Sequence, residues 1–325
     1  MKQLITFSLV VSVLLAGCGG TVEAAPKLTA TATAPPPPTK TASITPTATI
    51  TPTFTISPTP TPTWVVQGPD AIVIPILLYH RIAVSPINSQ YYVSPDKFED
   101  QMKLLHAWEY TVIPIELLVK AIKEGAELPP RPVIITFDDG DISVYETAFP
   151  IMQKYGLTGV AYIVGNYMDT DGYMTAEQIK KLAAAGWEIG SHSRSHRDLT
   201  KLRVPIQRQE IYQARRDLEQ ATGVQATTFA YPFGFMDDSV GSQVHAAGYI
   251  AAMGLGFTSD QGKSNLFWLQ RRDVKGTYDI KQFAFFLPWQ GDPAYMPTDT
   301  PTPTPTASRT PIPTYTQYPT STSQP

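Results

Sequence analysis

The middle of the chain alternates short apolar runs with helix-like segments, and this alternation limits the fold more than any other feature of the sequence. The runs have the length and the β-branched or aromatic content of strands. Strands that alternate with helices are joined by crossovers and lie parallel, so the fold class is α/β, either a barrel or a doubly wound sheet. In both architectures the functional loops follow the carboxyl ends of the strands. The expected strands are residues 72–79, 110–113, 133–137, 159–164, 187–189, 227–231, 249–253 and 268–274, and the expected helices are residues 94–106, 116–123, 141–155, 175–185, 205–222 and 237–247.

Proline divides the 325 residues into a foldable middle and two flanks. Of the 31 prolines, 18 lie within residues 26–62 and 297–325, where threonine is also abundant. Such segments lack the apolar side chains that offset the entropy of ordering. We therefore expect a disordered Thr/Pro-rich linker at 18–63, one large domain at 64–292, and a disordered Thr/Pro-rich tail at 293–325.

The amino terminus predicts export. Lys2 precedes an apolar stretch, 4–15, that is too short to span a bilayer as a mature helix, and small residues then lead to Cys18. The letters LAGC resemble the bacterial lipoprotein box, which implies a signal peptide at 1–17 and lipidation of the Cys18 thiol. The expected location is the outer face of the bacterial cell membrane. Since Cys18 is the only cysteine, no intrachain disulfide is expected.

The net charge of −3 argues against nucleic acid as a partner. A protein that binds a polyanion needs clustered lysine and arginine to replace the counterions, and the central region has no such cluster. The oligomeric state is not readable from the sequence.

Polar clusters follow several of the expected strands. Asp138 and Asp139 end the run VIITF, and the letters HSRSH place His192 and His196 four residues apart after WEIG. On a helical turn that spacing puts both imidazoles on one face, where they could share a metal ion with a nearby carboxylate. Taken alone, two histidines at this spacing are also common as exposed loop residues.

Five stretches together resemble the polysaccharide deacetylase family, carbohydrate esterase family 4, also called the NodB-homology domain. They are ILLYHRI at 76–82, TFDDG at 136–140, MTAEQIKKLAAAGWEIG at 174–190, HSRSH at 192–196 and AYPFG at 230–234. The resemblance covers residues 72 to about 287. It implies a distorted (β/α) barrel with about seven repeats.

The resemblance also implies a hydrolytic site. Asp139, His192 and His196 would bind one divalent metal ion, most often zinc, and Asp138 would be the general base. The backbone N–H of Phe233 would stabilise the oxyanion, and Pro232 with Phe233 would form one wall of the substrate groove. A metal with three protein ligands keeps a position for water and lowers the pKa of that water.

Two departures from the family pattern concern the proton donor and an arginine. Many members carry a late LxH histidine as general acid, and here no histidine follows Trp268. Members that begin with a YH pair are thought to use that histidine, which is His80 here; the alternative is that His80 packs at the rim. The arginine that usually orients the base is also missing near AYPFG. Arg271 in LQRRDV is the candidate to replace it, unless it is a solvated charge at a strand end.

The expected activity is removal of N-acetyl groups from N-acetylglucosamine units of a cell-surface or extracellular polysaccharide. The YH subgroup resembles deacetylases of poly-β-1,6-N-acetylglucosamine, while peptidoglycan and chitin-like polymers stay open. One alternative is an O-acetyl esterase on xylan-like glycans, because the same chemistry cleaves esters. Another is a surface lipoprotein that binds carbohydrate without turnover. The complete set of two aspartates and two histidines argues against this last reading, since a binding protein does not need a base beside a metal.

Overall fold

The computed structural model describes residues 63–291. The predicted signal peptide at 1–17, the lipidation site Cys18, the linker up to residue 62 and the tail from residue 293 lie outside the described residues. Between residues 63 and 291, none of the helices combines the length and the apolar character that a membrane crossing requires.

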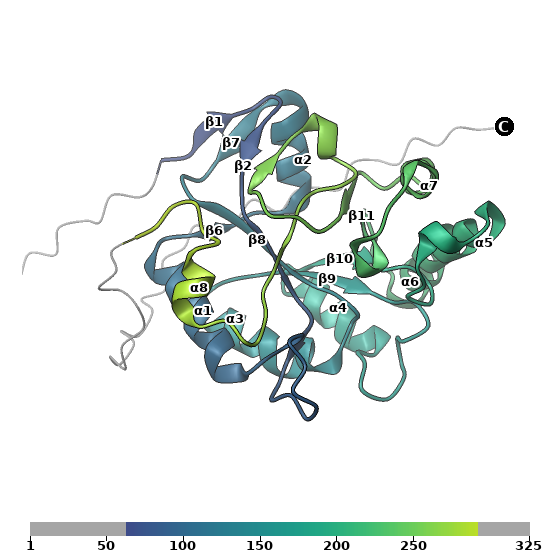
Figure 1. Ribbon diagram of the computed structural model, residues 1–325, viewed down its shortest axis with the longest axis horizontal. Helices are drawn as coiled ribbons and strands as arrows, with labels where there is room; N and C mark the ends of the chain where they lie inside the picture. Colours follow the sequence, from purple (N-terminus) through teal and green to yellow (C-terminus); the bar gives the residue numbers. More distant parts are fainter. Residues whose placement is uncertain (1–62, 292–325) are drawn as a thin grey trace, which may run out of the picture. The chain divides into compact units, whose positions relative to one another are not determined.

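A curled sheet of parallel strands forms the centre of the domain (Figure 1). In spatial order its strands are β12 (Ala251–Met253), β11 (Thr228–Ala230), β10 (Glu188–Ser191), β9 (Val160–Ile163), β8 (Pro132–Phe137), β3 (Ile76–Tyr79) and β14 (Arg272–Asp273). The short strand β6 (Thr111–Val112) pairs with the beginning of β8. The segment before β14 also joins the two edges of the sheet, because Leu269 forms a parallel bridge with Met253 of β12. The prediction of a distorted parallel barrel is confirmed.

Three two-stranded sheets lie outside this barrel. β1 (Val65–Gln67) pairs with β7 (Ala126–Leu128) and β2 (Ile72–Val73) with β13 (Asp260–Gln261), both antiparallel, whereas β4 (Arg81–Ile82) and β5 (Tyr92–Val93) are parallel.

Helices connect the strands and cover the sheet. They are α1 (Pro95–Ala107), α2 (Ile115–Glu124), η1 (Val144–Ala148), α3 (Phe149–Lys154), α4 (Ala176–Ala184), η2 (Leu199–Lys201), α5 (Val204–Arg208), η3 (Gln209–Gln213), α6 (Ala214–Thr222), η4 (Pro232–Gly234), α7 (Asp238–Ala246), η5 (Lys263–Asn265) and α8 (Ile280–Ala284). Figure 1 shows α1, α3 and α4 together on one side of the sheet and α2 on the opposite side. Local sequence sets several ends: Pro95 occupies the first turn of α1, and Gly223 ends α6 in the left-handed conformation.

Alternation along each strand separates an outer core from the barrel interior. On β8, Val133, Ile135 and Phe137 belong to the outer core with α1, α3 and α4. Ile134 belongs to the interior cluster, which α2 joins through Ile115, Leu118 and Ile122. The interior is therefore apolar at the end where β8 begins. At the other end, the next inward positions of β8 are Thr136 and Asp138, so polar groups take over toward the carboxyl ends of the strands.

The elements differ from the sequence prediction in a few places. Pro75 divides the predicted strand 72–79 into β2 and β3, because proline cannot donate to the ladder. The predicted strand 268–274 is a bridge at Leu269 followed by the two residues of β14. The predicted helix 141–155 contains a π-helical turn, η1, and the predicted helix 205–222 contains a second one, η3. The short helix α8 and the β1–β7 pair were not predicted.

Candidate active site

The two aspartates that follow β8 point in different directions. Asp138 continues the inward-facing series of Ile134 and Thr136, and its backbone N–H donates to the Tyr79 carbonyl at 3.0 Å. Its side chain is 3% exposed. Asp139 adopts a left-handed conformation with φ of +73°, which turns the chain away from the strand and leaves its side chain 13% exposed at the mouth of the barrel.

The segment HSRSH is an irregular loop, not the helical turn on which a spacing of four residues would put both imidazoles on one face. His192 follows β10 directly, and its backbone N–H donates to the Ile163 carbonyl at 2.8 Å. Ser193 and His196 then have φ of +64° and +55°, values that cost a residue other than glycine on the order of 1 kcal/mol each. The two turns bring the imidazole centroids to 5.0 Å, so the loop places both rings close enough to share one metal ion.

Asp139, His192 and His196 form a cluster that suits a divalent metal ion. One potential ligand atom from each side chain lies within 4.8 Å of the other two. The Nε2 atoms of His192 and His196 lie 3.7 and 3.4 Å from Oδ1 of Asp139. The Nδ1 of His192 lies 2.8 Å from the Ala230 carbonyl, which can only accept, so Nδ1 carries the proton and Nε2 offers its lone pair. Two imidazoles and one carboxylate are a donor set that zinc uses when one position is left for water.

The pKa of His196 supports the same arrangement. Burial lowers the pKa of this imidazole, and the neighbouring His192 lowers it further, against an opposing effect of Asp139. A neutral imidazole is the form that binds a metal, so no proton has to be displaced from His196 at neutral pH.

Arg271 holds the first aspartate. The guanidinium donates from Nη1 to Oδ1 and from Nη2 to Oδ2 of Asp138, each at 2.7 Å, and its Nε donates to the Gly254 carbonyl at 3.1 Å. Arg271 is 1% exposed and lies over the ring of Tyr162, with its Cζ 5.5 Å from the centroid. Arg271 is therefore not a solvated charge at a strand end.

The charge of Arg271 decides the protonation state of Asp138. Burial by itself raises the pKa of this carboxyl, but the attraction of Arg271, His192 and His80 and the hydrogen bonds from Arg271 together outweigh burial and lower the pKa to about 2. Asp138 is thus ionised at neutral pH, as a proton acceptor must be.

An ion-pair chain holds the outer oxygen of Asp139. Nη1 of Arg81 lies 3.5 Å from Oδ2 of Asp139, and Nε of Arg81 donates to Asp141 at 2.9 Å. Asp141 accepts in turn from the Ser143 hydroxyl. Since Oδ1 of Asp139 faces the imidazoles, Arg81 and the metal cluster use different oxygens of one carboxylate.

His80 lies between two carboxylates. Register pairs Tyr79 of β3 with Phe137 of β8 and Leu78 with Asp273 of β14, which sets His80 beside Asp138 and diagonal to Asp273 on the inward face. The ring packs against Tyr91 with centroids 4.9 Å apart. Within residues 63–291, the buried Nδ1 of His80 and Oδ1 of Asp273 have no hydrogen-bond partner. Burial raises the pKa of Asp273, opposed by its attraction to His80.

Pro232 and Phe233 lie at the mouth, after β11. Pro232 is buried, whereas Phe233 is 50% exposed with its ring centroid 4.6 Å from that of His196. Phe233 has φ of +59°. Phe235, also about half exposed, lies with its ring centroid 6.0 Å from that of Phe233, so it extends the exposed aromatic surface beyond the ring that contacts His196.

Several residues of the site were not predicted. Arg81, Asp141 and Asp273 contact or flank the predicted site residues. No motif in the sequence indicates which residue each of them contacts. The pattern of inward positions on β14 could have found Asp273, because it lies two residues after Arg271 and alternation puts both on the same face.

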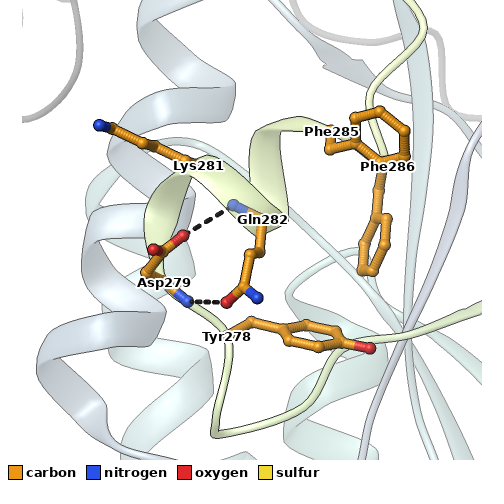
Figure 2. Close-up of a pocket in the computed structure, with 6 residues that line it drawn as sticks. All are labelled: Tyr278, Asp279, Lys281, Gln282, Phe285 and Phe286. Carbon is orange, nitrogen blue, oxygen red and sulfur yellow. Dashed lines mark hydrogen bonds between the residues drawn. The ribbon is translucent and has the colours of Figure 1, made fainter.

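A hollow of about 450 Å³ lies elsewhere on the domain, beside α8. Figure 2 shows its lining of Tyr278, Asp279, Lys281, Gln282, Phe285 and Phe286. Asp279 and Gln282 are hydrogen-bonded to each other as the capping box of α8. These polar groups are thus engaged in starting the helix, and no cluster of metal-ligating side chains lies there among the described residues.

Comparisons with known proteins identify relatives of this chain. The model of the family named Polysaccharide deacetylase matches residues 125–252, which include both aspartates and both histidines but neither His80 nor Arg271. YxkH of Bacillus subtilis strain 168, provisionally named a polysaccharide deacetylase, is 30% identical over 195 residues, which are 59% of this chain and 66% of that protein. A poly-β-1,6-N-acetyl-D-glucosamine N-deacetylase of Staphylococcus aureus strain MRSA252 is 24% identical over 56% of this chain and 67% of its own length. The chain thus spans about two thirds of the length of each.

A solved structure shows the same fold. The deacetylase PplD of Streptococcus pyogenes, determined in complex with acetate, superposes with a TM-score of 0.62 at 23% identity and covers 70% of this chain and 99% of that one.

Proposed function

The described domain belongs to the polysaccharide deacetylase family, and from that premise we propose that the protein is a metal-dependent hydrolase that removes N-acetyl groups from N-acetylglucosamine units of a cell-surface or extracellular polysaccharide. One observation carries the proposal. The metal-ligating cluster of Asp139, His192 and His196 lies beside a buried carboxylate, Asp138, that Arg271 keeps ionised. A binding site for neutral sugar needs neither a base nor a metal in this arrangement.

A bound divalent ion, for which the donor set suits zinc, would polarise the acetyl carbonyl and lower the pKa of an attacking water. Asp138 accepts the proton that water loses as its oxygen bonds to the acetyl carbon. Arg271 keeps Asp138 in one orientation, because two parallel hydrogen bonds fix both carboxylate oxygens. The Phe233 backbone N–H, held at the mouth by the left-handed turn, is the donor for the oxyanion.

The second half of the reaction breaks the C–N bond and needs a proton on the leaving nitrogen. His80 is the candidate donor, because it lies next to Asp138 on the inward face. The products are acetate and the free amine of glucosamine. Water contributes a hydroxyl group to acetic acid, which ionises to acetate. The proton that Asp138 accepts from water balances the proton that His80 donates to the leaving nitrogen.

Poly-β-1,6-N-acetylglucosamine is the proposed substrate. The name of the Staphylococcus aureus relative and the Tyr79-His80 pair at the start of the barrel support it. The exposed ring of Phe233 beside His196, and that of Phe235 next to it, suit the apolar faces of sugar rings.

Acetate release tests the proposal. The zinc-loaded protein is assayed against β-1,6 and β-1,4 N-acetylglucosamine oligomers, peptidoglycan and acetylxylan. Fastest release from the β-1,6 oligomers supports the proposed substrate. Release from acetylxylan alone would identify an O-acetyl esterase instead, and no release from any of the four with zinc bound would contradict hydrolysis.

We also propose that Cys18 carries the lipid that holds the protein at the outer face of the cell membrane. The LAGC sequence after a short apolar stretch supports this. Membrane fractionation of cells that express the wild-type chain or the Cys18→Ser variant tests it. Equal membrane association of the two chains would overturn the assignment.

A further inference from the structure

A glutamate outside the recognised motifs holds the loop that carries both metal-ligating histidines. Glu210 lies on the π-helical turn η3 and is 5% exposed. Its Oε2 accepts from the backbone N–H groups of Arg194 and Ser195 at 3.1 and 2.8 Å. Its Oε1 accepts from the Ser195 hydroxyl at 2.5 Å. Three donors from two adjacent loop residues therefore converge on one buried carboxylate.

The opposite side of the same loop is bound to the turn after β9. The Gly165 N–H donates to the Ser193 carbonyl at 3.0 Å, and the Asn166 N–H donates to the Arg194 carbonyl at 2.8 Å. The β9 turn thus supplies donors and Glu210 supplies acceptors. Residues 193–195 are held between them.

This clamp acts where the backbone is strained. Ser193 and His196, at the two ends of the clamped segment, both have the left-handed conformation that residues other than glycine rarely adopt. Such conformations persist only when the surroundings determine them. Here they decide the position of the His196 ring, whose Nε2 lies 3.4 Å from Asp139.

Glu210 acts in this clamp as a hydrogen-bond acceptor. An ionised carboxylate only accepts, and all three groups that it meets can donate. Among the described residues no lysine, arginine or histidine forms an ion pair with Glu210, and the Arg194 side chain is directed to Asp217, with Nε 3.6 Å from Oδ2. The loop N–H groups are therefore the partners of its charge.

We propose that Glu210 is a positioning residue of the metal centre, which acts through the loop 193–195 to fix His196 in the ligating geometry. This inference rests on the metal site of the proposed function. Groups that orient metal ligands typically contribute 10- to 100-fold to metal affinity.

The test measures zinc affinity of the full chain by competition with a chromophoric chelator. We expect Glu210→Ala to bind zinc about 10- to 100-fold more weakly than wild type. Glu210→Gln should recover most of the affinity, because an amide oxygen can still accept from both backbone N–H groups and the Ser195 hydroxyl can reverse to accept from the amide nitrogen. The visible spectrum of the cobalt-substituted protein reports ligand geometry and should change in Glu210→Ala but not in Glu210→Gln.

Glu219 supplies a matched control. It follows Glu210 along the same helical run, and its Oε1 accepts from the backbone N–H of Ala226 at 3.0 Å and from the Arg215 side chain at 2.9 Å. Ala226 lies in the loop after α6, which carries no metal ligand. Glu219→Ala should lower thermal stability and leave zinc affinity unchanged. An equal loss of zinc affinity in Glu219→Ala would reduce Glu210 to a general structural role.

The zinc-binding results distinguish a failure of this inference from a failure of the proposed function. If the wild-type chain fails to bind one zinc ion, the metal site itself is wrong. If wild type binds zinc and Glu210→Ala binds it equally tightly, the site stands and the role of Glu210 is overturned. Should Glu210→Ala not fold, Ser195→Ala removes only the hydroxyl contact, and we expect zinc affinity several-fold below wild type; unchanged affinity in that variant would also overturn the role.

Discussion

Two carboxylates are buried at opposite ends of the barrel, and their pKa values move in opposite directions. Asp138 lies after β8 at the carboxyl ends of the strands, and its pKa falls to about 2. Glu188 begins β10 at the amino ends, and its pKa rises to about 7. Burial raises the pKa at both positions, so burial alone does not explain the difference.

The hydrogen-bond partners of the two carboxylates explain the difference between their pKa values. Asp138 receives two charged hydrogen bonds from Arg271, whereas Glu188 receives one neutral hydrogen bond, from the Ile115 N–H at 2.7 Å. Glu188 is partly exposed as a residue, yet its Oε2 is buried and has no partner within the described part of the chain. The functional end of the barrel therefore contains a fixed charge, and the opposite end contains a carboxyl whose charge the fold disfavours.

The largest expected effect follows from removing the charge of Asp138. Asp138→Asn should lower kcat for acetate release by roughly 10³- to 10⁴-fold, because an amide cannot accept the proton of the attacking water. Zinc stoichiometry, measured by atomic emission, should stay near one per chain, since the ligands are Asp139 and the two histidines. Persistent acetate release in this variant would show that another group is the base.

Removing Arg271, the partner of Asp138, should lower the stability of the fold. Arg271→Met leaves the Asp138 charge buried without compensation, which typically costs about 3 kcal/mol or more. Urea unfolding of the metal-free protein measures this loss. As a control, Arg272→Met alters the adjacent outward arginine, which lies over Phe286, and should cost much less. Equal losses in the two variants would contradict a specific role for the Arg271–Asp138 pair.

Replacing His80, whose Nδ1 has no hydrogen-bond partner within residues 63–291, should affect amide and ester substrates differently. We expect His80→Ala to lower kcat for an N-acetylated oligomer by about 10²-fold, because the leaving nitrogen needs a proton. An aryl acetate has a better leaving group and should lose far less. Equal losses on both substrates would indicate that His80 packs at the rim and does not donate the proton.

The smallest expected effect concerns Glu188 and pH. Its folded-state pKa is raised above the usual value of 4.5, so its contribution to stability is fully present below about pH 4.5 and is lost as pH rises through about 7. Glu188→Gln removes this loss and should be more stable than wild type by about 2 kcal/mol at pH 8, with little difference at pH 4.5. Chemical unfolding at several pH values measures it. A constant difference across that range would show that Glu188 does not titrate as stated.

Sequence reasoning reached most of the architecture. The alternation of apolar runs with helices predicted parallel strands in either a barrel or a doubly wound sheet, because crossover connections leave few other arrangements. The resemblance to the deacetylase family then implied the barrel. It did not predict the break at Pro75, the π-helical turns or α8, since these depend on small local differences that hydrophobic periodicity does not register. It also did not predict the strained loop at HSRSH, which is held between Glu210 and the β9 turn.

The amino-acid sequence is enough to name the chemical groups of the candidate site and their chain order. Asp138, Asp139, His192 and His196 stand in short motifs at strand ends, and local spacing is readable from one chain. The groups that control them follow from the folded domain, since the sequence offered Arg271 only as a candidate and left a solvated charge as the alternative. Arg271 meets Asp138 across 133 residues, and Ile115 meets Glu188 across 73. Closure of the sheet creates these contacts, and no local sequence pattern encodes them. The pKa of each buried acid therefore depends on whether the folded barrel places a charged partner beside it.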